Sequence, residues 1–195
     1  MIAALLLALV QIATTADDPA WSKAVPVRNG RQPVARFQAR IDGDYLIVRA
    51  IHEEGWHTYA MDNEVRAEKA LKGKQSLGIE QGIEIEIESG LKPAEQWRQT
   101  NPHDFSKPEM RWYTYGFSQT ALFARRVATV TSEPIVLKVR GQACDGETCC
   151  RVDIVLEVEE HSAVERTPEQ TERLRKMLNE LVPVQPREPD SSPSK

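Results

Sequence analysis

Short runs in which apolar and polar residues alternate recur along the chain from about residue 34 to residue 159. The alternation is strictest in Gly82–Glu88, which reads Gly-Ile-Glu-Ile-Glu-Ile-Glu. A period of two places the isoleucines on one face of a strand and the glutamates on the other. Asp42-Gly43-Asp44 separates the first two runs and favours a hairpin turn. The expected strands are Val34–Ile41, Tyr45–Ile51, Gly82–Glu88, Trp112–Phe117, Ala121–Val130, Pro134–Gln142 and Val152–Glu159.

Two other segments break this pattern. Asn63–Leu77 is rich in Ala, Glu, Lys and Leu, which favours a helical turn or two. Leu91–Pro108 is rich in Pro, Asn, Gln and Lys, and we expect it to form a long loop. The order of the elements gives no sign of β-α-β alternation. Short strands with regular turn signals therefore predict an all-β fold, a β-sandwich, over residues 34–160.

The character of the chain changes after the sandwich. Thr167-Pro168-Glu169-Gln170 is typical of a helix start, with Thr167 as the N-cap and Gln170 at the capping-box position. We therefore expect residues 161–182 to form a linker and a short helix, from about Pro168 to Leu181, which docks on the sandwich. Its apolar stripe would be Leu174, Met177, Leu178 and Leu181. Residues 183–195 hold four prolines and two adjacent serines, which predicts a disordered tail.

The N-terminus carries an apolar run that ends before the first charge, at Asp17. The run is shorter than the roughly 20 residues that a membrane-spanning helix needs. It ends in small residues, Thr14 and Ala16, at the spacing that a signal peptidase accepts. Residues 1–16 are therefore predicted to be a signal peptide, and residues 17–33 an arm that leads into the fold. The mature protein would be soluble and periplasmic or extracellular, where disulfides persist.

The length and net charge of the chain limit the kinds of function that it could have. The chain has 195 residues, enough for one domain with a proper core. Its net charge is −4 and its isoelectric point is near 5.7. Binding to nucleic acid needs a clustered basic surface, whereas the basic residues here are scattered among acidic ones. No nucleic-acid partner is expected.

All three cysteines lie within ten residues, Gly141–Cys150. Asp145-Gly146 is a turn signal, so Cys144 and Cys149 should flank a tight loop between two strands, close enough for a disulfide. Closing so small a loop contributes only roughly 2 kcal/mol through the entropy of the unfolded chain. Such a bridge is a weak staple but suits thiol–disulfide exchange, because both sulfurs stay at one exposed loop.

Cys150 directly follows Cys149, so on a strand the two side chains point to opposite faces. We favour Cys149 as the partner of Cys144, which leaves Cys150 as an inward-facing or spare third thiol. Three interpretations stay open: a redox-active pair, a structural disulfide and a metal site. The spacing of two cysteines separated by two residues, usual for metal sites, is absent, and no metal or cofactor is predicted.

Three motifs resemble a known family when they are taken together. They are Gly55-Trp56-His57-Thr58-Tyr59, the step Tyr115-Gly116 before a strand, and Gln142-Ala143-Cys144 followed after four residues by Cys149. In this order they resemble the periplasmic N-terminal domain of the DsbD-type thiol:disulfide interchange protein, over about Val34–Glu159. The resemblance implies an immunoglobulin-like sandwich with two redox cysteines on neighbouring strands. The further domains of that family are absent here, so the chain would be a stand-alone, divergent copy.

The resemblance also implies roles for individual residues. Cys149 would exchange with partners and Cys144 would resolve the mixed disulfide. Tyr59 matches an aromatic residue near the dithiol, and Tyr115 with Gly116 matches the loop that shields it. The implied partners are extracytoplasmic thioredoxin-like or disulfide-bonded proteins, with a separate membrane thiol reductase as electron source.

His57 departs from the family pattern, because an aromatic residue often lies at this position. An imidazolium there would favour the thiolate form of a nearby cysteine. The sequence thus predicts a thiol–disulfide exchange domain, a candidate oxidoreductase or electron relay. The alternative is a non-catalytic interaction or ligand-binding module on the same sandwich, with a structural disulfide.

Overall fold

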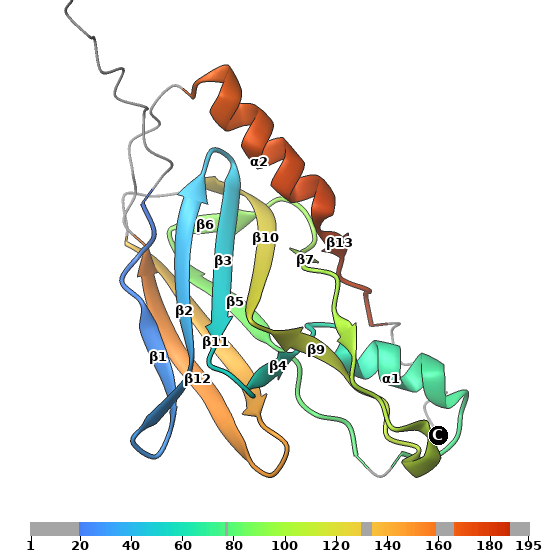
Figure 1. Cartoon of the computed structure of the whole chain (residues 1–195). Coiled ribbons are helices and arrows are strands. Elements are labelled where there is room, and N and C mark those ends of the chain that lie inside the picture. Colours follow the sequence, from blue (N-terminus) through green and yellow to red (C-terminus); the bar gives the residue numbers. More distant parts are fainter. Residues whose placement is uncertain (1–19, 77, 130–133, 159–165, 188–195) are drawn as a thin grey trace, which may run out of the picture.

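The computed structural model describes residues 20–76, 78–129, 134–158 and 166–187. In this part of the chain, two antiparallel sheets form a sandwich (Figure 1). The predicted all-β, immunoglobulin-like sandwich with a short C-terminal helix is confirmed. The predicted signal peptide, residues 1–16, lies outside the described residues.

The first sheet contains the first three strands of the chain. Its strands, in spatial order, are β1 (Val25–Asn29), β2 (Gln32–Asp42), β3 (Tyr45–His52), β10 (Thr120–Thr129), β7 (Arg98–Gln99) and β13 (Val182–Pro183), and β6 (Leu91–Pro93) also pairs with β10. The β2–β3 hairpin is the one predicted from Asp42-Gly43-Asp44. Gly43 has φ of 64°, a conformation that favours glycine.

The second sheet carries the cysteines. Its strands, in spatial order, are β12 (Cys149–Val158), β11 (Ile135–Cys144), β4 (His57–Tyr59), β9 (Tyr115–Ser118) and β8 (His103–Asp104), and β5 (Glu84–Ser89) also pairs with β11. In β5 the isoleucines lie inside and the glutamates are exposed, as the alternating sequence predicts.

The core fills the space between the two sheets with apolar side chains from both. Phe117 on β9 and Phe123 on β10 meet edge to face, with 5.5 Å between their ring centroids. Leu137 on β11 and Phe37 on β2 are fully buried in the same cluster. Burial of these apolar side chains away from water provides the main driving force for folding of the sandwich.

Two helices lie outside the sandwich. Helix α1 (Asn63–Leu71) falls in the segment predicted to be helical, and a 3₁₀ turn covers Pro108–Met110. Helix α2 (Pro168–Glu180) begins with the predicted capping box, in which the Thr167 side chain accepts from the backbone N–H of Gln170. None of the helices in the described part of the chain is long and apolar enough to cross a bilayer.

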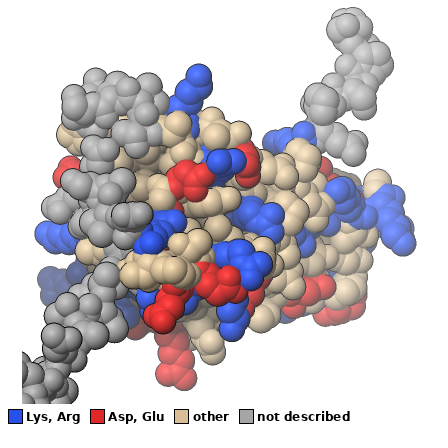
Figure 2. Space-filling model, turned by 90° about the horizontal axis from the view of Figure 1, so that it is seen from above, with Lys and Arg blue, Asp and Glu red and all other residues tan. Residues whose placement is uncertain are grey.

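Helix α2 docks on the outer face of the first sheet (Figure 1). Leu174 and Leu181 are buried there against Ile47 of β3 and Ala124 of β10. The apolar stripe predicted for the helix therefore covers the sheet. Basic and acidic side chains are interspersed on the face of the molecule seen in Figure 2.

At one end of the sandwich the chain crosses repeatedly between the two sheets, including once from β7 to β8. It leaves the first sheet after His52 and enters the second at His57, and it returns at Gln119 between β9 and β10. Gln119 has φ of 63°, which lets the chain turn sharply at that point. These crossings bring β4 beside β11 and β9 beside β4.

Several predicted boundaries differ from the structure. The long loop expected at Leu91–Pro108 contains strands β6, β7 and β8, and the arm expected at residues 17–33 contains β1. In the tail expected from residue 183, Pro183 belongs to β13 and the backbone N–H of Val184 donates to Trp97 O at 3.0 Å. Strands β6, β7, β8 and β13 have only two or three residues, too few to show an alternating pattern, so only pairing with neighbours reveals them.

Candidate functional site

The β11–β12 hairpin ends in a disulfide between Cys144 and Cys149. These two residues are direct cross-strand partners, with 4.1 Å between their Cα atoms and 2.02 Å between their sulfurs. The Asp145 carboxylate closes the loop between them by accepting from the backbone N–H groups of Glu147 at 2.7 Å and Thr148 at 2.8 Å. The turn thus holds both cysteines in place without relying on the bridge.

The two cysteines differ sharply in their access to solvent. Only 1% of the surface of Cys144 is exposed, whereas Cys149 belongs to the exposed residues of the hairpin tip. An incoming thiolate can therefore approach Cys149 and is kept from Cys144. This asymmetry gives each cysteine of the pair a different chemical role.

A row of four paired residues crosses the second sheet at the level of the disulfide. Cys149 pairs with Cys144, Cys144 with His57, and His57 with Ser118. Residues directly opposite in a sheet point to the same face. The disulfide, the imidazole and the serine hydroxyl therefore share the outer face of the second sheet.

The adjacent row faces the interior and contains the third cysteine. Cys150 pairs with Ala143, a core residue, and its half-buried side chain packs against the core. Burial raises the pKa of the Cys150 thiol, and the Asp145 carboxylate raises it further. The Cys150 thiol thus points away from the disulfide, as expected for successive residues of a strand. Burial favours its protonated form, which is the less reactive one.

His57 is half-buried and contacts two aromatic side chains, Tyr59 and Phe105. Its Nε2 lies 3.2 Å from Tyr59 Oη, and its ring centroid lies 5.1 Å from that of Phe105. Burial lowers the pKa of His57, although the carboxylates of Glu80 and Asp145 partly offset this. The ring is therefore neutral at neutral pH. A titratable imidazole therefore lies beside the disulfide, and burial disfavours its charged form.

Glu80 belongs to the segment that joins α1 to β5, and this segment passes beside Tyr59, where the backbone N–H of Ile83 donates to Tyr59 O at 3.1 Å. Tyr59 is buried, and burial raises the pKa of its phenol, with a further rise from the Glu80 carboxylate. Glu80 Oε1 accepts from Trp112 Nε1 at 2.5 Å, and its buried Oε2 has no hydrogen-bond partner among the described residues. The backbone N–H of Gln81 donates to Gln142 Oε1 at 2.9 Å, which fastens the segment over β11.

The two remaining predicted neighbours, Tyr115 and Gly116, point to different faces. Gly116 pairs with Tyr59 on the outer face, where an added Cβ would lie 2.3 Å from Thr58 O, so a larger residue does not fit. Tyr115 packs against the core, and the Arg66 guanidinium lies 5.9 Å from its ring centroid. Tyr115 is thus separated from the disulfide by the sheet itself.

Phe105 and Glu80 are site residues that the sequence did not identify. Phe105 follows β8, and its backbone N–H donates to Thr114 O at 3.0 Å, which places the ring over His57. A lone aromatic residue in a polar segment was the only available signal for Phe105. Nothing in the local sequence of Glu80 distinguishes it from the other glutamates nearby.

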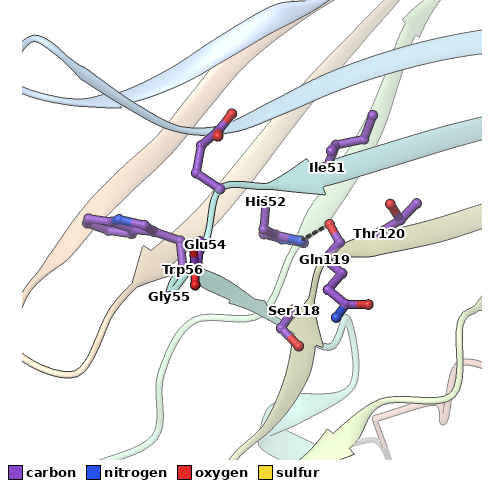
Figure 3. Close-up of a pocket in the computed structure, with 9 residues that line it drawn as sticks. Ile51, His52, Glu54, Gly55, Trp56, Ser118, Gln119 and Thr120 are labelled. Atoms are coloured by element: carbon purple, nitrogen blue, oxygen red, sulfur yellow. Dashed lines mark hydrogen bonds between the residues drawn. The ribbon is translucent and has the colours of Figure 1, made fainter.

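A depression opens beside this row at the crossing end of the sandwich. Figure 3 shows its lining, in which the ring of His52 points toward Gln119. Nδ1 of His52 lies 3.0 Å from Gln119 O, and Nε2 lies 2.9 Å from Thr58 Oγ1. Because a carbonyl oxygen only accepts, Nδ1 carries the hydrogen and Nε2 accepts from the Thr58 hydroxyl. Burial lowers the pKa of His52 to about 4.

The described residues contain no group of three or more His, Cys, Asp or Glu side chains arranged to hold a metal ion. The candidate site consists of the disulfide, the neutral imidazole of His57, the buried phenol of Tyr59 and the carboxylate of Glu80. These groups can exchange disulfides and move protons.

Comparison with known proteins gives matches among solved structures only. No family model matches the chain, and no curated protein matches it in sequence. The reduced N-terminal domain of DsbD from Neisseria meningitidis is similar to 64% of this chain and 83% of its own length, with a TM-score of 0.44 and 16% sequence identity. The GAE domain of GGA2p from Saccharomyces cerevisiae is similar to 71% of this chain over its whole length, with a TM-score of 0.36 and 5% identity.

Proposed function

We propose that this protein is an extracytoplasmic thiol–disulfide exchange domain that passes electrons between protein thiols through Cys144 and Cys149. One observation carries the proposal. The disulfide closes the tip of a hairpin with one cysteine exposed and the other buried. Access decides which sulfur of a disulfide exchanges with a partner, so the exposed sulfur reacts with partners and the buried one is left to resolve the mixed disulfide.

The two cysteines then act in sequence. In the reduced protein, the Cys149 thiolate attacks a partner disulfide, forms a mixed disulfide and releases one partner thiolate. Cys144 next attacks the Cys149 sulfur, which closes the intramolecular bridge and releases the second partner thiolate. Two protein thiols are oxidised, one partner disulfide is reduced, and the two thiol protons pass to the partner thiolates.

The small size of the loop supports exchange over a structural role. Four residues lie between the two cysteines, and the turn is already held by hydrogen bonds to Asp145. A bridge over so short a loop contributes only roughly 2 kcal/mol through chain entropy. The fold therefore depends little on the bridge, which leaves it free to open and close.

The motifs shared with the DsbD-type family suggest the partners. They would be thioredoxin-like or disulfide-bonded proteins outside the cytoplasm, and a separate membrane thiol reductase would supply electrons. The apolar run before Asp17 supports export to the periplasm or beyond. The exchange requires no cofactor, because the electrons travel in the sulfur–sulfur bond itself.

Trapping tests the proposal. In Cys144→Ser the resolving thiol is missing, so a partner attacked by Cys149 stays covalently bound until a reductant is added. Cys149→Ser is the matched control, because it keeps the buried thiol and removes the exposed one. We expect reductant-sensitive adducts with Cys144→Ser only. Adducts with neither variant, or with both equally, would contradict the proposal.

One observation favours a second candidate, an interaction or ligand-binding module with a structural disulfide. The Asp145 carboxylate lies in the hairpin loop, and a negative charge near a thiol disfavours the thiolate. Under this alternative, a variant in which both Cys144 and Cys149 are serine still binds its partner, and no adduct is trapped.

A further inference from the structure

Cys144 lies between two reactive groups in the second sheet. On one side its cross-strand partner is Cys149, and on the other it is His57. Side chains of directly opposite residues have Cβ atoms about 4.5–5.5 Å apart. The imidazole on β4 therefore lies directly beside Cys144, on the same outer face of the sheet.

Burial makes the proton of Cys144 hard to remove. In the disulfide form 1% of the surface of Cys144 is exposed, and in the same surroundings hydroxide from bulk water would have little access to the reduced thiol. Yet the resolving step of exchange requires Cys144 as a thiolate, because the thiolate is the nucleophile. A protein group beside Cys144 must then accept this proton.

His57 has the protonation state that this task requires. Its lowered pKa keeps the ring neutral near pH 7, so one ring nitrogen presents a lone pair. When Nε2–H donates to Tyr59 Oη, that lone pair is on Nδ1, which makes no hydrogen bond within the described part of the chain. The contact with Tyr59 thus orients the ring, and with the phenol oxygen as acceptor it leaves the lone pair on Nδ1.

Glu80 supplies a negative charge next to this ring. Its Oε1 is held by Trp112 Nε1, while Oε2 is buried and lacks a hydrogen-bond partner among the described residues. A buried carboxylate oxygen without a donor is unfavourable unless a positive or donating group forms nearby. Its charge favours the protonated form of His57. An imidazolium that forms transiently would therefore be stabilised by Glu80.

We propose that His57 is the base that takes the proton from the Cys144 thiol in the resolving step, and that Glu80 is a positioning residue that stabilises the resulting imidazolium. This inference rests on the proposed thiol–disulfide exchange. His57 thereby carries out the proton transfer that converts the Cys144 thiol into a nucleophilic thiolate, and Glu80 supports it.

Nδ1 of His57 accepts the proton of the Cys144 thiol, and the thiolate attacks the sulfur of Cys149 in the mixed disulfide. The bond between Cys144 and Cys149 forms as the bond from Cys149 to the partner sulfur breaks. The partner leaves as a thiolate, and the imidazolium returns its proton to that thiolate or to water.

Other charged and titratable groups also surround His57 and act on its protonation. Asp145, in the hairpin loop, favours the imidazolium, and His52 on β3 interacts unfavourably with it when both rings are charged. Tyr59 lies two residues along the same strand, and its phenol stays protonated because burial raises its pKa. From β8, His103 contacts the Phe105 ring, with 6.2 Å between centroids.

The experiment separates the two thiol steps with a chromogenic probe. The full chain is used in reduced form with Cys150→Ala, so that only two thiols remain. One equivalent of dithiobis(nitrobenzoate) reacts first with Cys149, which releases one nitrothiobenzoate. Attack by Cys144 then releases the second. Stopped-flow absorbance follows both releases as a function of pH.

We expect the second release to depend on His57. In the parent protein its rate should rise with pH as the imidazole loses its proton and then level off. In His57→Gln this plateau should vanish, the rate should follow hydroxide concentration, and it should fall roughly a hundredfold at neutral pH, as is typical for loss of a general base. His103→Gln, at an exposed histidine on the same face, is the matched control and should behave as the parent.

Glu80→Gln gives a second variant that keeps an acceptor for Trp112. Without the carboxylate, the titration midpoint of His57 should move to lower pH, both in imidazole NMR signals and in the rate profile of the second release. A merely structural role for Glu80 would change the amplitude and leave this midpoint unchanged.

The outcomes distinguish the inference from the function on which it rests. If Cys149 fails to give the first release, the proposed exchange function is wrong. If both releases occur and the pH profile of the second is the same in His57→Gln, Glu80→Gln and His103→Gln, exchange stands and the assignment of His57 as the base is wrong.

Discussion

Cys149 is exposed, whereas Cys144, its direct partner across the β11–β12 hairpin, is almost completely buried. The sheet produces this difference, because Cys144 has a neighbouring strand, β4, on its far side and Cys149 begins the edge strand β12. Access to one sulfur and protection of the other thus follow from strand order. The β4 residue next to Cys144 is His57, so the same strand order places an imidazole beside the protected sulfur.

Gly116 is expected to be essential for the packing of β9 against β4. A Cβ at this position would lie 2.3 Å from Thr58 O, so Gly116→Ala forces the strands apart and should destabilise the fold by about 1–3 kcal/mol. Urea unfolding measures the change. Gly146→Ala is the control, because its Cβ would meet nothing within 4 Å. Equal losses in the two variants would contradict this account of the packing.

The buried His52 is expected to make stability depend on pH. Its pKa of about 4 in the folded protein lies below the ordinary 6.5, so the fold favours the neutral ring. The resulting stability is fully present above pH 6.5 and is lost as pH falls toward 4, by at most on the order of 3 kcal/mol. Unfolding free energies measured between pH 7 and pH 4 should therefore fall less steeply in His52→Gln than in the parent.

His103→Gln serves as the control for this pH dependence, since His103 is exposed. His57 has a lowered pKa as well and contributes with the same sign, so some dependence remains after His52 is replaced. A pH dependence that is identical in His52→Gln and in the parent would show that the buried ring is not responsible.

Asp62 is expected to anchor the C-terminal segment to helix α1. Its fully buried carboxylate accepts from Arg66 Nε at 2.8 Å, from Gln99 Nε2 at 2.6 Å and from the backbone N–H of Gln185 at 2.9 Å. Asp62→Ala leaves these donors unpaired and should destabilise the fold by roughly 3 kcal/mol. Thermal or urea unfolding measures this loss.

An exposed ion pair at the same helix provides the comparison. Glu64 pairs with Arg187 at 3.0 Å, with both side chains largely open to solvent. Glu64→Ala should therefore lower the stability by less than about 1 kcal/mol. If Glu64→Ala is as damaging as Asp62→Ala, the buried hydrogen bonds of Asp62 do not hold the segment.

The third cysteine is expected to take no part in exchange. Cys150 points into the core beside Ala143, and burial raises the pKa of its thiol. Cys150→Ala should keep the rate of exchange at the parent value and lower the stability by about 1 kcal/mol through lost packing. Loss of exchange in this variant would contradict the placement of Cys150 away from the reacting pair.

The sequence predicted the features that depend on local pattern. The alternation in β5, the hairpin at Gly43, the capping box at Thr167 and the turn between Cys144 and Cys149 each rest on a few neighbouring residues. In each of these cases the local preference and the final fold agree, which is what makes a short pattern informative.

The features that the sequence missed depend on contacts between distant segments. Phe105 and Glu80 reach His57 only because two irregular segments fold over the outer face of the second sheet. The charge of His57 could not be read from its neighbours either, since its pKa is set mainly by burial. The inward direction of Tyr115 follows from the register of β9 on β4, which the motif alone does not give.

The reduction potential of the Cys144–Cys149 pair tests the central claim most directly. The full chain is equilibrated in a series of glutathione or dithiothreitol redox buffers, and the free thiols are alkylated and counted. The variant with serine at both positions supplies the baseline of Cys150. The account predicts a potential above about −300 mV, in the range of exchange-active dithiols. A value well below about −300 mV would identify a structural bridge that resists reduction and would contradict the account.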